Sequence, residues 1–156
     1  MSDKNVRIIK VTPAPYAAIV VGRMTSAELV RRWKANGISS AVYDALKAGA
    51  LPKGGHNIWV YRNARNGESD IEVGVQMPEK FADFGDVVCR ETPAGEVATV
   101  AHFGDYSRFG EAYEAIFAFV LQSGRRVTDA FWEVYGDWDP DPSKVRTDIY
   151  HLLEPL

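Results

Sequence analysis

The feature of this sequence that most restricts its fold is an internal duplication. The order strand, bend, strand, helix, strand, strand is expected over residues 6–77 and again over residues 87–153. Thr-Pro-Ala occurs at residues 12–14 and again at 92–94, and Val-Tyr occurs at 60–61 and again at 134–135. Matches that recur in the same order predict two similar units. We therefore expect one domain over residues 1–156, with repeat 1 at about 5–78, repeat 2 at about 86–156, and a pseudo-twofold axis between them.

The expected elements follow from residue type and spacing. Ser26 is a good N-cap, and Ala27, Val30 and Trp33 form a helical stripe after it. This helix is expected to break at Asn36-Gly37, restart at Ser39 or Ser40, and end near Gly49 and Pro52. A second helix is expected over residues 108–122, with a buried stripe formed by Phe109, Tyr113, Ile116, Phe117 and Val120. Runs of β-branched and aromatic residues predict strands at 6–11, 16–21, 57–61, 71–77, 87–91, 97–103, 131–135 and 147–153.

Composition excludes several classes of function. The chain is 46% hydrophobic and 25% charged, with a net charge of −3. Acidic and basic residues are interspersed, which argues against general nucleic-acid binding. Cys89 is the single cysteine and the three histidines lack metal-ligand spacing, so neither a metal site nor a cofactor is expected. No signal-peptide core or membrane-length apolar run occurs, which predicts a cytoplasmic protein without membrane contact.

One carboxylate stands out in the predicted strand at 131–135. Side chains alternate between the two faces of a strand, so Glu133 shares its face with Phe131 and Tyr135. Two interpretations remain open at this point. Glu133 is either an ordinary exposed residue on the outer face of a strand, or a carboxylate inside an aromatic-walled cleft, where an unpaired charge is costly to bury.

The repeat register favours the cleft. Alignment of the two Val-Tyr pairs places Trp59 at the position of Glu133, so Trp59 and Tyr61 would face a groove between the repeats together with Glu133 and Tyr135. Aromatic rings around one carboxylate suit an aromatic or lipophilic cation. The residues that alternate with this set are expected to face the helices: Ile58, Val60, Trp132 and Val134.

Two further groups of polar residues have structural alternatives. His102 is expected to be a hydrogen-bonded structural histidine rather than a proton shuttle. Glu72 and Asp148 occupy matching positions in the two repeats, and we expect solvent-facing acids rather than a paired-carboxylate site.

The sequence resembles the GyrI-like (gyrase-inhibitor-like) small-molecule-binding domains, which occur as effector-binding parts of multidrug-responsive regulators and as free-standing proteins. The resemblance is strongest over residues 87–156 and lies in four segments: Pro93-Ala94-Gly95, His102-Phe103-Gly104-Asp105-Tyr106, Trp132-Glu133-Val134-Tyr135 and Arg146-Thr147-Asp148-Ile149-Tyr150. It implies an α+β fold of duplicated βαββ repeats, with antiparallel sheets and a ligand groove between the halves. It also implies that Glu133 matches the family's buried acidic residue, which faces cationic drugs, and that Tyr150 matches an aromatic residue of the same pocket.

The expected function is binding of a lipophilic, cationic or aromatic small molecule, for sensing or sequestration of a drug or toxin. The expected ligand contacts are Glu133, Trp59, Tyr61, Tyr135, Tyr150 and Phe131. One alternative is a hydrolase of cyclopropanoid-type toxins, with Glu133 as base or nucleophile and Tyr150 or Tyr135 as proton donor.

A second alternative is a protein that modulates gyrase. The family's regulators carry a helix-turn-helix region before this domain, whereas here the domain is expected to begin within the first few residues. Direct DNA binding is therefore not expected, and a separate protein partner, gyrase or a regulator, stays open.

Overall fold

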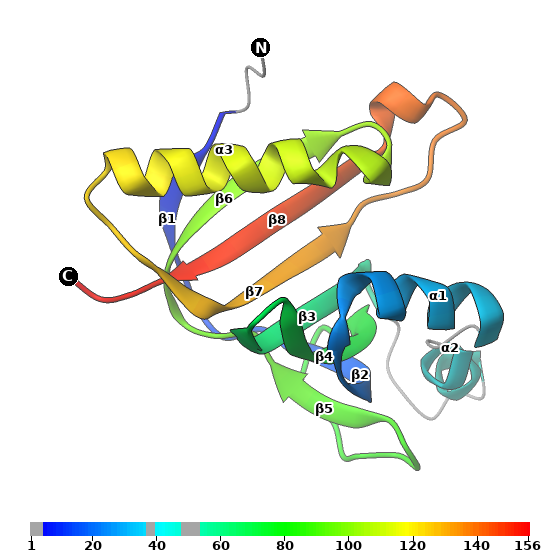
Figure 1. Cartoon of the computed structure of the whole chain (residues 1–156). Coiled ribbons are helices and arrows are strands. Elements are labelled where there is room, and N and C mark those ends of the chain that lie inside the picture. The colour runs from blue at the N-terminus through cyan, green and yellow to red at the C-terminus, as the bar shows by residue number, and fades with distance from the viewer. Residues whose placement is uncertain (1–4, 37–39, 48–53) are drawn as a thin grey trace.

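The computed structural model describes residues 5–36, 40–47 and 54–156, and its framework is an eight-stranded antiparallel sheet. The first repeat contributes β1 (Arg7–Val11), β2 (Pro15–Thr25), α1 (Ser26–Asn36), α2 (Ser40–Lys47), β3 (Asn57–Arg65) and β4 (Glu68–Gln76) (Figure 1). The second contributes β5 (Val88–Glu91), β6 (Gly95–Phe103), α3 (Phe109–Gln122), β7 (Val127–Tyr135) and β8 (Arg146–Leu153), with short 3₁₀ turns before α3 and β8. Gly37, Ser39, Gly49 and Pro52, where helix boundaries were predicted, lie outside the described residues.

The strand order confirms the predicted duplication. Across the sheet the order is β1-β6-β8-β7-β3-β4-β2-β5. Replacing each strand by its counterpart in the other repeat gives the same order in reverse, so a pseudo-twofold axis passes between β3 and β7. In that central pair Trp59 lies directly opposite Glu133, and Tyr61 lies opposite Phe131. The fold is α+β and built from two similar halves, which are joined edge to edge in one sheet.

The outermost strands are exchanged between the halves. β1 pairs with β6 of the second repeat, and β5 pairs with β2 of the first. Each is followed by one of the repeated Thr-Pro-Ala segments, where proline cannot continue the ladder of hydrogen bonds. The two bends bind each other: the Ala14 amide donates to Thr92 Oγ1 at 3.0 Å, and the Thr92 amide donates to the Ala14 carbonyl at 2.9 Å. The repeated motif therefore marks the point at which each chain segment crosses to the other half.

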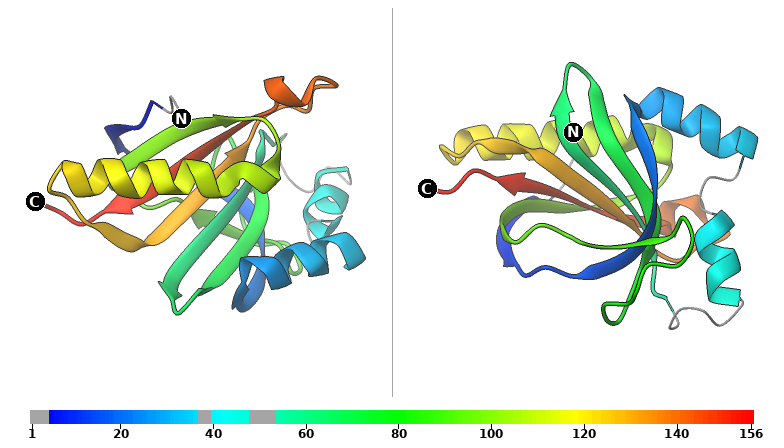
Figure 2. Two further views of the ribbon diagram at one scale, coloured as in Figure 1. Left: turned by 45° about the horizontal axis from the view of Figure 1, so that its top comes forward. Right: turned by 90° about the horizontal axis from the view of Figure 1, so that it is seen from below.

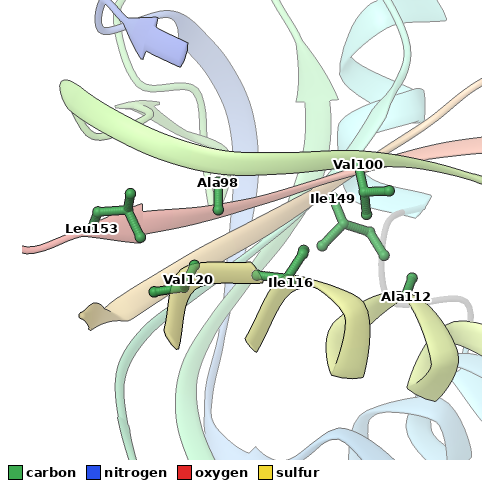
Figure 3. Packing of buried hydrophobic residues seen from close by; sticks show 7 residues of the cluster. All are labelled: Ala98, Val100, Ala112, Ile116, Val120, Ile149 and Leu153. Atoms are coloured by element: carbon green, nitrogen blue, oxygen red, sulfur yellow. The ribbon is translucent and has the colours of Figure 1, made fainter. Parts of the chain in front are cut away.

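The helices lie on one face of the sheet. Figure 2 shows α3 across the strands of the second repeat, and α1 and α2 beside those of the first. The buried residues Ala112, Ile116 and Val120 of α3 pack against β6 and β8 (Figure 3). Phe117, which was predicted to be buried with them, is 46% exposed because it lies at the margin of this contact.

The opposite face carries a second apolar cluster, and it corrects one prediction. Ile58, Val60, Trp132 and Val134 were expected to face the helices, but they lie on the side away from them. They pack there with residues from strands that are far apart in the sheet, including Tyr16 of β2 and Val97 of β6. The sheet is curled, so its concave face is filled by its own side chains and needs no helix to cover it.

The start of α1 also differs by one residue from the prediction. The Glu28 amide donates to Thr25 Oγ1 at 3.2 Å, so Thr25 rather than Ser26 acts as the N-cap. β2 runs directly into α1 without a loop, and this fixes α1 on the face of the sheet that carries Glu133.

Candidate functional site

Glu133 is buried at the centre of the sheet and is held by tyrosines. Its side chain is 4% exposed, which excludes the interpretation as an outer-face residue. Oε1 accepts hydrogen bonds from the hydroxyls of Tyr61 at 3.0 Å and Tyr135 at 2.6 Å, and Oε2 accepts one from Tyr113 at 2.5 Å. No lysine, arginine or histidine within residues 5–36, 40–47 and 54–156 forms an ion pair with this carboxylate.

The donors reach Glu133 from three elements. Tyr61 comes from β3, two residue pairs along from the Trp59–Glu133 pair, and Tyr135 follows Glu133 two residues later on β7. Tyr113 comes from α3, which crosses this face of the sheet. The sequence placed Tyr113 in the buried stripe of its helix and did not assign it to the site. The hydroxyl was the available signal, because a buried tyrosine usually finds a hydrogen-bond partner for it.

Burial and hydrogen bonding act in opposite directions on Glu133. Removal from water raises the pKa of its carboxyl group, while the hydrogen bonds from Tyr113, Tyr135 and Tyr61 lower it. The pKa values of the three tyrosines are raised well above the usual range, first by burial and then by the negative charge of Glu133. The tyrosines therefore stay protonated as donors, and the carboxylate has polar partners but, among the residues that the structure describes, no positive charge to balance it.

Aromatic rings extend away from Glu133 in two directions. On the first side Trp59 meets Tyr135 edge-on, with ring centroids 5.5 Å apart, and meets Trp33 of α1 at 6.4 Å. On the other side Phe131 stacks on Tyr61 at 4.6 Å and packs edge-on against Tyr113 at 5.7 Å. The residues predicted to share a face with Glu133 are thus brought together with it.

Tyr150 is not brought to this cluster. It pairs directly with Trp132 and stacks on that ring at 5.4 Å on the concave face, whereas Ile149 is the residue opposite Glu133. Because neighbouring residues of a strand point to opposite faces, the sheet separates Tyr150 from Glu133. The structure therefore corrects the expectation that Tyr150 lines the same site.

The other candidate residues have structural partners. His102 is buried, and its Nε2 lies 2.9 Å from the Asp105 carbonyl, as expected for a structural histidine. The expectation of a solvent-facing acid is wrong for Glu72, which is 8% exposed. It accepts from the Tyr16 hydroxyl and pairs with Arg62 at 3.4 Å and Arg90 at 3.3 Å. The exchanged strand β5 supplies Arg90 and covers this carboxylate.

The matching acid of the second repeat, Asp148, instead pairs with Arg146 at 2.8 Å, so the two acids do not form a joint site. Within the described part of the chain, no group of three or more His, Cys, Asp or Glu residues is placed to hold a metal ion. None of the described helices combines the length and apolar character needed to cross a membrane.

Solved structures share this fold. The chain aligns with EcmrR in a cryo-EM structure of its DNA complex, with a TM-score of 0.75 and 16% identity, over 98% of this chain and 58% of that one. It therefore spans little more than half of the EcmrR chain. It also aligns with SAV2435 bound to tetraphenylphosphonium (TM-score 0.67, 12% identity, 96% of this chain and 94% of that one).

A hydrolase from Listeria innocua aligns with a TM-score of 0.58 and 13% identity, over 96% of this chain and 91% of that one. At these identities the likeness concerns the fold alone. No curated protein sequence matches the chain significantly.

The sequence itself identifies the family. Residues 52–153 match the model of the GyrI-like small molecule binding domain, a range that includes β3 to β8 and therefore Glu133 with its three tyrosine donors. The chain belongs to the GyrI-like small-molecule-binding domain family.

Proposed function

We propose that this protein binds lipophilic cations, for sensing or sequestration, and that Glu133 provides the counter-charge. The observation that carries the proposal is a buried carboxylate with aromatic neighbours and no cationic partner among the described residues. A bound cation stabilises the charged form of Glu133 in a site where burial disfavours it. The tetraphenylphosphonium complex of SAV2435, which shares the fold, supports this ligand class.

The rings supply the second part of the binding energy. Trp59, Tyr135 and Phe131 provide apolar area and π faces, to which a poorly hydrated cation is attracted. Trp33 on α1 and Phe117 on α3 are each 46% exposed at opposite ends of the ring cluster. We propose that the ligand reaches Glu133 from this side, between α1 and α3.

Isothermal titration with tetraphenylphosphonium and the neutral triphenylphosphine oxide tests this assignment. Glu133→Gln should weaken binding of the cation by about 1–3 kcal/mol, the range for a lost charge-assisted contact, and leave the neutral compound unaffected. Trp59→Ala should weaken the binding of both compounds, because it removes ring area and not charge.

Asp129→Asn is the matched control, since Asp129 is an exposed acid on the same strand. This substitution removes one negative charge without changing the site. The variant should bind both compounds as tightly as the parent protein does. If Glu133→Gln binds tetraphenylphosphonium as tightly as the parent protein, the assignment of Glu133 is wrong.

A hydrolase is the second candidate, and one observation favours it. Glu133 has a raised pKa and is in direct hydrogen-bond contact with Tyr135, so a base and a proton donor lie side by side. With Tyr150 on the other face of the sheet, we assign the donor role in this alternative to Tyr135. A screen of strained-ring electrophiles would support it through turnover that Glu133→Gln abolishes and Tyr135→Phe reduces sharply.

We propose that the chain does not bind specific DNA by itself, because its net charge is −3 and its basic residues are dispersed. A gel shift with specific, salt-resistant retention of DNA would contradict this. Interaction with gyrase or with a separate regulator stays a prediction, and a pull-down with purified gyrase tests the first of these.

A further inference from the structure

A second buried polar group lies on the same face of the sheet as Glu133. His151 of β8 is 4% exposed and pairs across the sheet with Phe131, two residues from Glu133 on β7. Its Nδ1 atom has no hydrogen-bond partner within residues 5–36, 40–47 and 54–156. Buried polar atoms are nearly always hydrogen-bonded, and one that is not costs stability. A buried nitrogen without a hydrogen-bond partner beside a binding site therefore points to a partner that the protein itself does not supply.

The imidazole is part of the ring cluster around Glu133. It stacks on Phe131 with centroids 5.1 Å apart and an interplanar angle of 26°, and it meets Phe117 edge-on at 5.5 Å. Phe131 in turn stacks on Tyr61, which donates to Glu133. A ligand ring that contacts Phe131 and Phe117 would thus also contact His151.

The spacing of the two polar groups sets the size of the ligand. Glu133 pairs directly with Ile149, and His151 is the next residue of β8 on the same face. Such diagonal neighbours lie roughly 7–8 Å apart. This separation corresponds to about one aromatic ring between a positive centre and a polar substituent.

The imidazole acts here as a neutral group. Burial lowers the pKa of His151 to about 4, and a backbone interaction with Leu152 opposes this only in part. A neutral imidazole with its proton on Nε2 presents Nδ1 as a hydrogen-bond acceptor. The group suited to it is an O–H or N–H donor, and a second positive charge is not required.

We propose that His151 is a specificity-determining residue of the ligand site, whose Nδ1 accepts a hydrogen bond from an O–H or N–H group on an aromatic arm of a lipophilic cation. The inference rests on the proposed function, because it assumes that the cation lies at Glu133. It narrows the ligand class from lipophilic cations in general to those that carry a hydrogen-bond donor one ring away from the charge.

Two matched cations test this inference: tetraphenylphosphonium and (4-hydroxyphenyl)triphenylphosphonium, which differ by one hydroxyl group. The parent protein should bind the hydroxylated cation about 2- to 10-fold more tightly, the range for one net hydrogen bond. His151→Phe keeps the ring stack and should remove this preference for the hydroxylated cation. His151→Asn keeps a polar atom near the position of Nδ1 and should retain part of the preference.

His56→Phe is the control, because His56 is an exposed histidine whose partner is Asp137. It should leave the preference unchanged. A measurement on the parent protein alone does not depend on the folding of any variant: the ¹⁵N resonance of His151 Nδ1 should shift with the hydroxylated cation and stay in place with tetraphenylphosphonium.

The outcomes separate the two proposals. Equal affinity of the parent protein for the two cations, or a preference that persists in His151→Phe, overturns the role of His151 and leaves cation binding at Glu133 standing. Absence of binding by either cation overturns the proposed function and this inference with it.

Discussion

Burial raises the pKa of Glu133, and of its three hydrogen bonds the one from Tyr113 lowers this pKa the most. Tyr113→Phe removes this donor and should raise the pKa of Glu133 further. Because the cation needs the carboxylate form, affinity for tetraphenylphosphonium falls as the pH drops through that pKa. We expect the midpoint of this fall to lie at a higher pH in Tyr113→Phe than in the parent protein, as measured by titrations between pH 4 and 8.

Tyr43→Phe is the control for this shift, because the Tyr43 hydroxyl binds Asn57 at the surface and not Glu133. It should reproduce the midpoint of the parent protein. A Tyr113→Phe midpoint that does not move, or moves to a lower pH, would contradict the hydrogen-bond pattern described for Glu133.

His151 links stability to pH with a definite sign. Its folded pKa of about 4 lies below the ordinary value of 6.5, so the unfolded chain binds the proton first as the pH falls. The contribution of the neutral His151 imidazole to the free energy of unfolding is fully present above pH 6.5. It is lost as the pH falls towards 4, by up to roughly 3 kcal/mol. The raised pKa of Glu133 acts with the opposite sign, and the measurement therefore belongs in a Glu133→Gln background.

Urea unfolding of Glu133→Gln and of Glu133→Gln/His151→Phe at pH 7 and pH 4 measures this contribution. The first protein should lose more free energy of unfolding between the two pH values than the second. Equal losses would show that His151 titrates normally in the folded state.

The residues of the site differ in how far the sequence could reveal them. Glu133 was visible because a charged residue interrupts an aromatic strand, and Trp59 and Tyr61 followed from the repeat register. Tyr113 and His151 depend on contacts between a helix and a sheet and between neighbouring strands, which no single-strand pattern contains. Tyr150 was misplaced because a resemblance gives a position in the chain, whereas the face of the sheet depends on the pairing of β7 with β8.

At the scale of elements, the type and the central residues of each helix and strand could be predicted from the sequence, but the residues at which the elements end could not. β2 continues to Thr25 and β3 to Arg65, beyond their apolar cores. Side-chain contacts hold these polar ends of the strands together. Arg23 of β2 pairs with Asp70 of β4 at 3.4 Å and donates a hydrogen bond to the Asn63 carbonyl of β3 at 2.9 Å. Such partners are set by strand pairing, so a reading based on apolar alternation ends the strands too early.

The pairing of β2 with β4 requires a glycine, which gives an element-scale prediction. A Cβ atom at Gly74 would lie 1.7 Å from the Ala17 carbonyl oxygen on β2. Gly74→Ala should therefore force these strands apart and destabilise the protein by about 3 kcal/mol, the upper part of the usual overpacking range. Gly110→Ala is the matched substitution in α3, where a Cβ meets nothing within 4 Å.

Because alanine favours the helical conformation more than glycine does, Gly110→Ala should raise the free energy of unfolding by up to about 1 kcal/mol. Urea unfolding of both variants measures the two effects, which are expected to have opposite signs. A Gly74→Ala protein as stable as the parent would contradict the close approach of β2 to β4.

At the scale of the whole molecule, the duplication predicted the architecture but not the exchange of strands. Two copies of one strand order imply two similar halves and a pseudo-twofold axis. They do not reveal whether β1 and β5 pair within their own repeat or with the other one, because both arrangements have the same local sequence. The Thr-Pro-Ala bends showed where the strands turn, and their direction depends on contacts such as those between Ala14 and Thr92.

The exchange leads to a prediction about the two halves as separate chains. A fragment of residues 1–78 carries β1, whose partner β6 lies in the other half, and a fragment of residues 79–156 carries β5, whose partner β2 lies in the first. Each fragment alone would also expose the edge that β3 and β7 share in the intact sheet. We expect neither fragment to fold stably alone, and the two to assemble into a one-to-one complex when refolded together.

Size-exclusion chromatography and circular dichroism of the separate and mixed fragments measure this assembly. In the complex Glu133 regains Tyr61 from the other fragment, so affinity for tetraphenylphosphonium should return on mixing and be absent from each fragment. A fragment of residues 13–78, which lacks β1, is the control: it leaves β6 unpaired and should assemble more weakly with residues 79–156. Stable, monomeric folding of either half alone would show that the exchanged strands and the β3–β7 edge are not needed, and that each repeat is an independent unit.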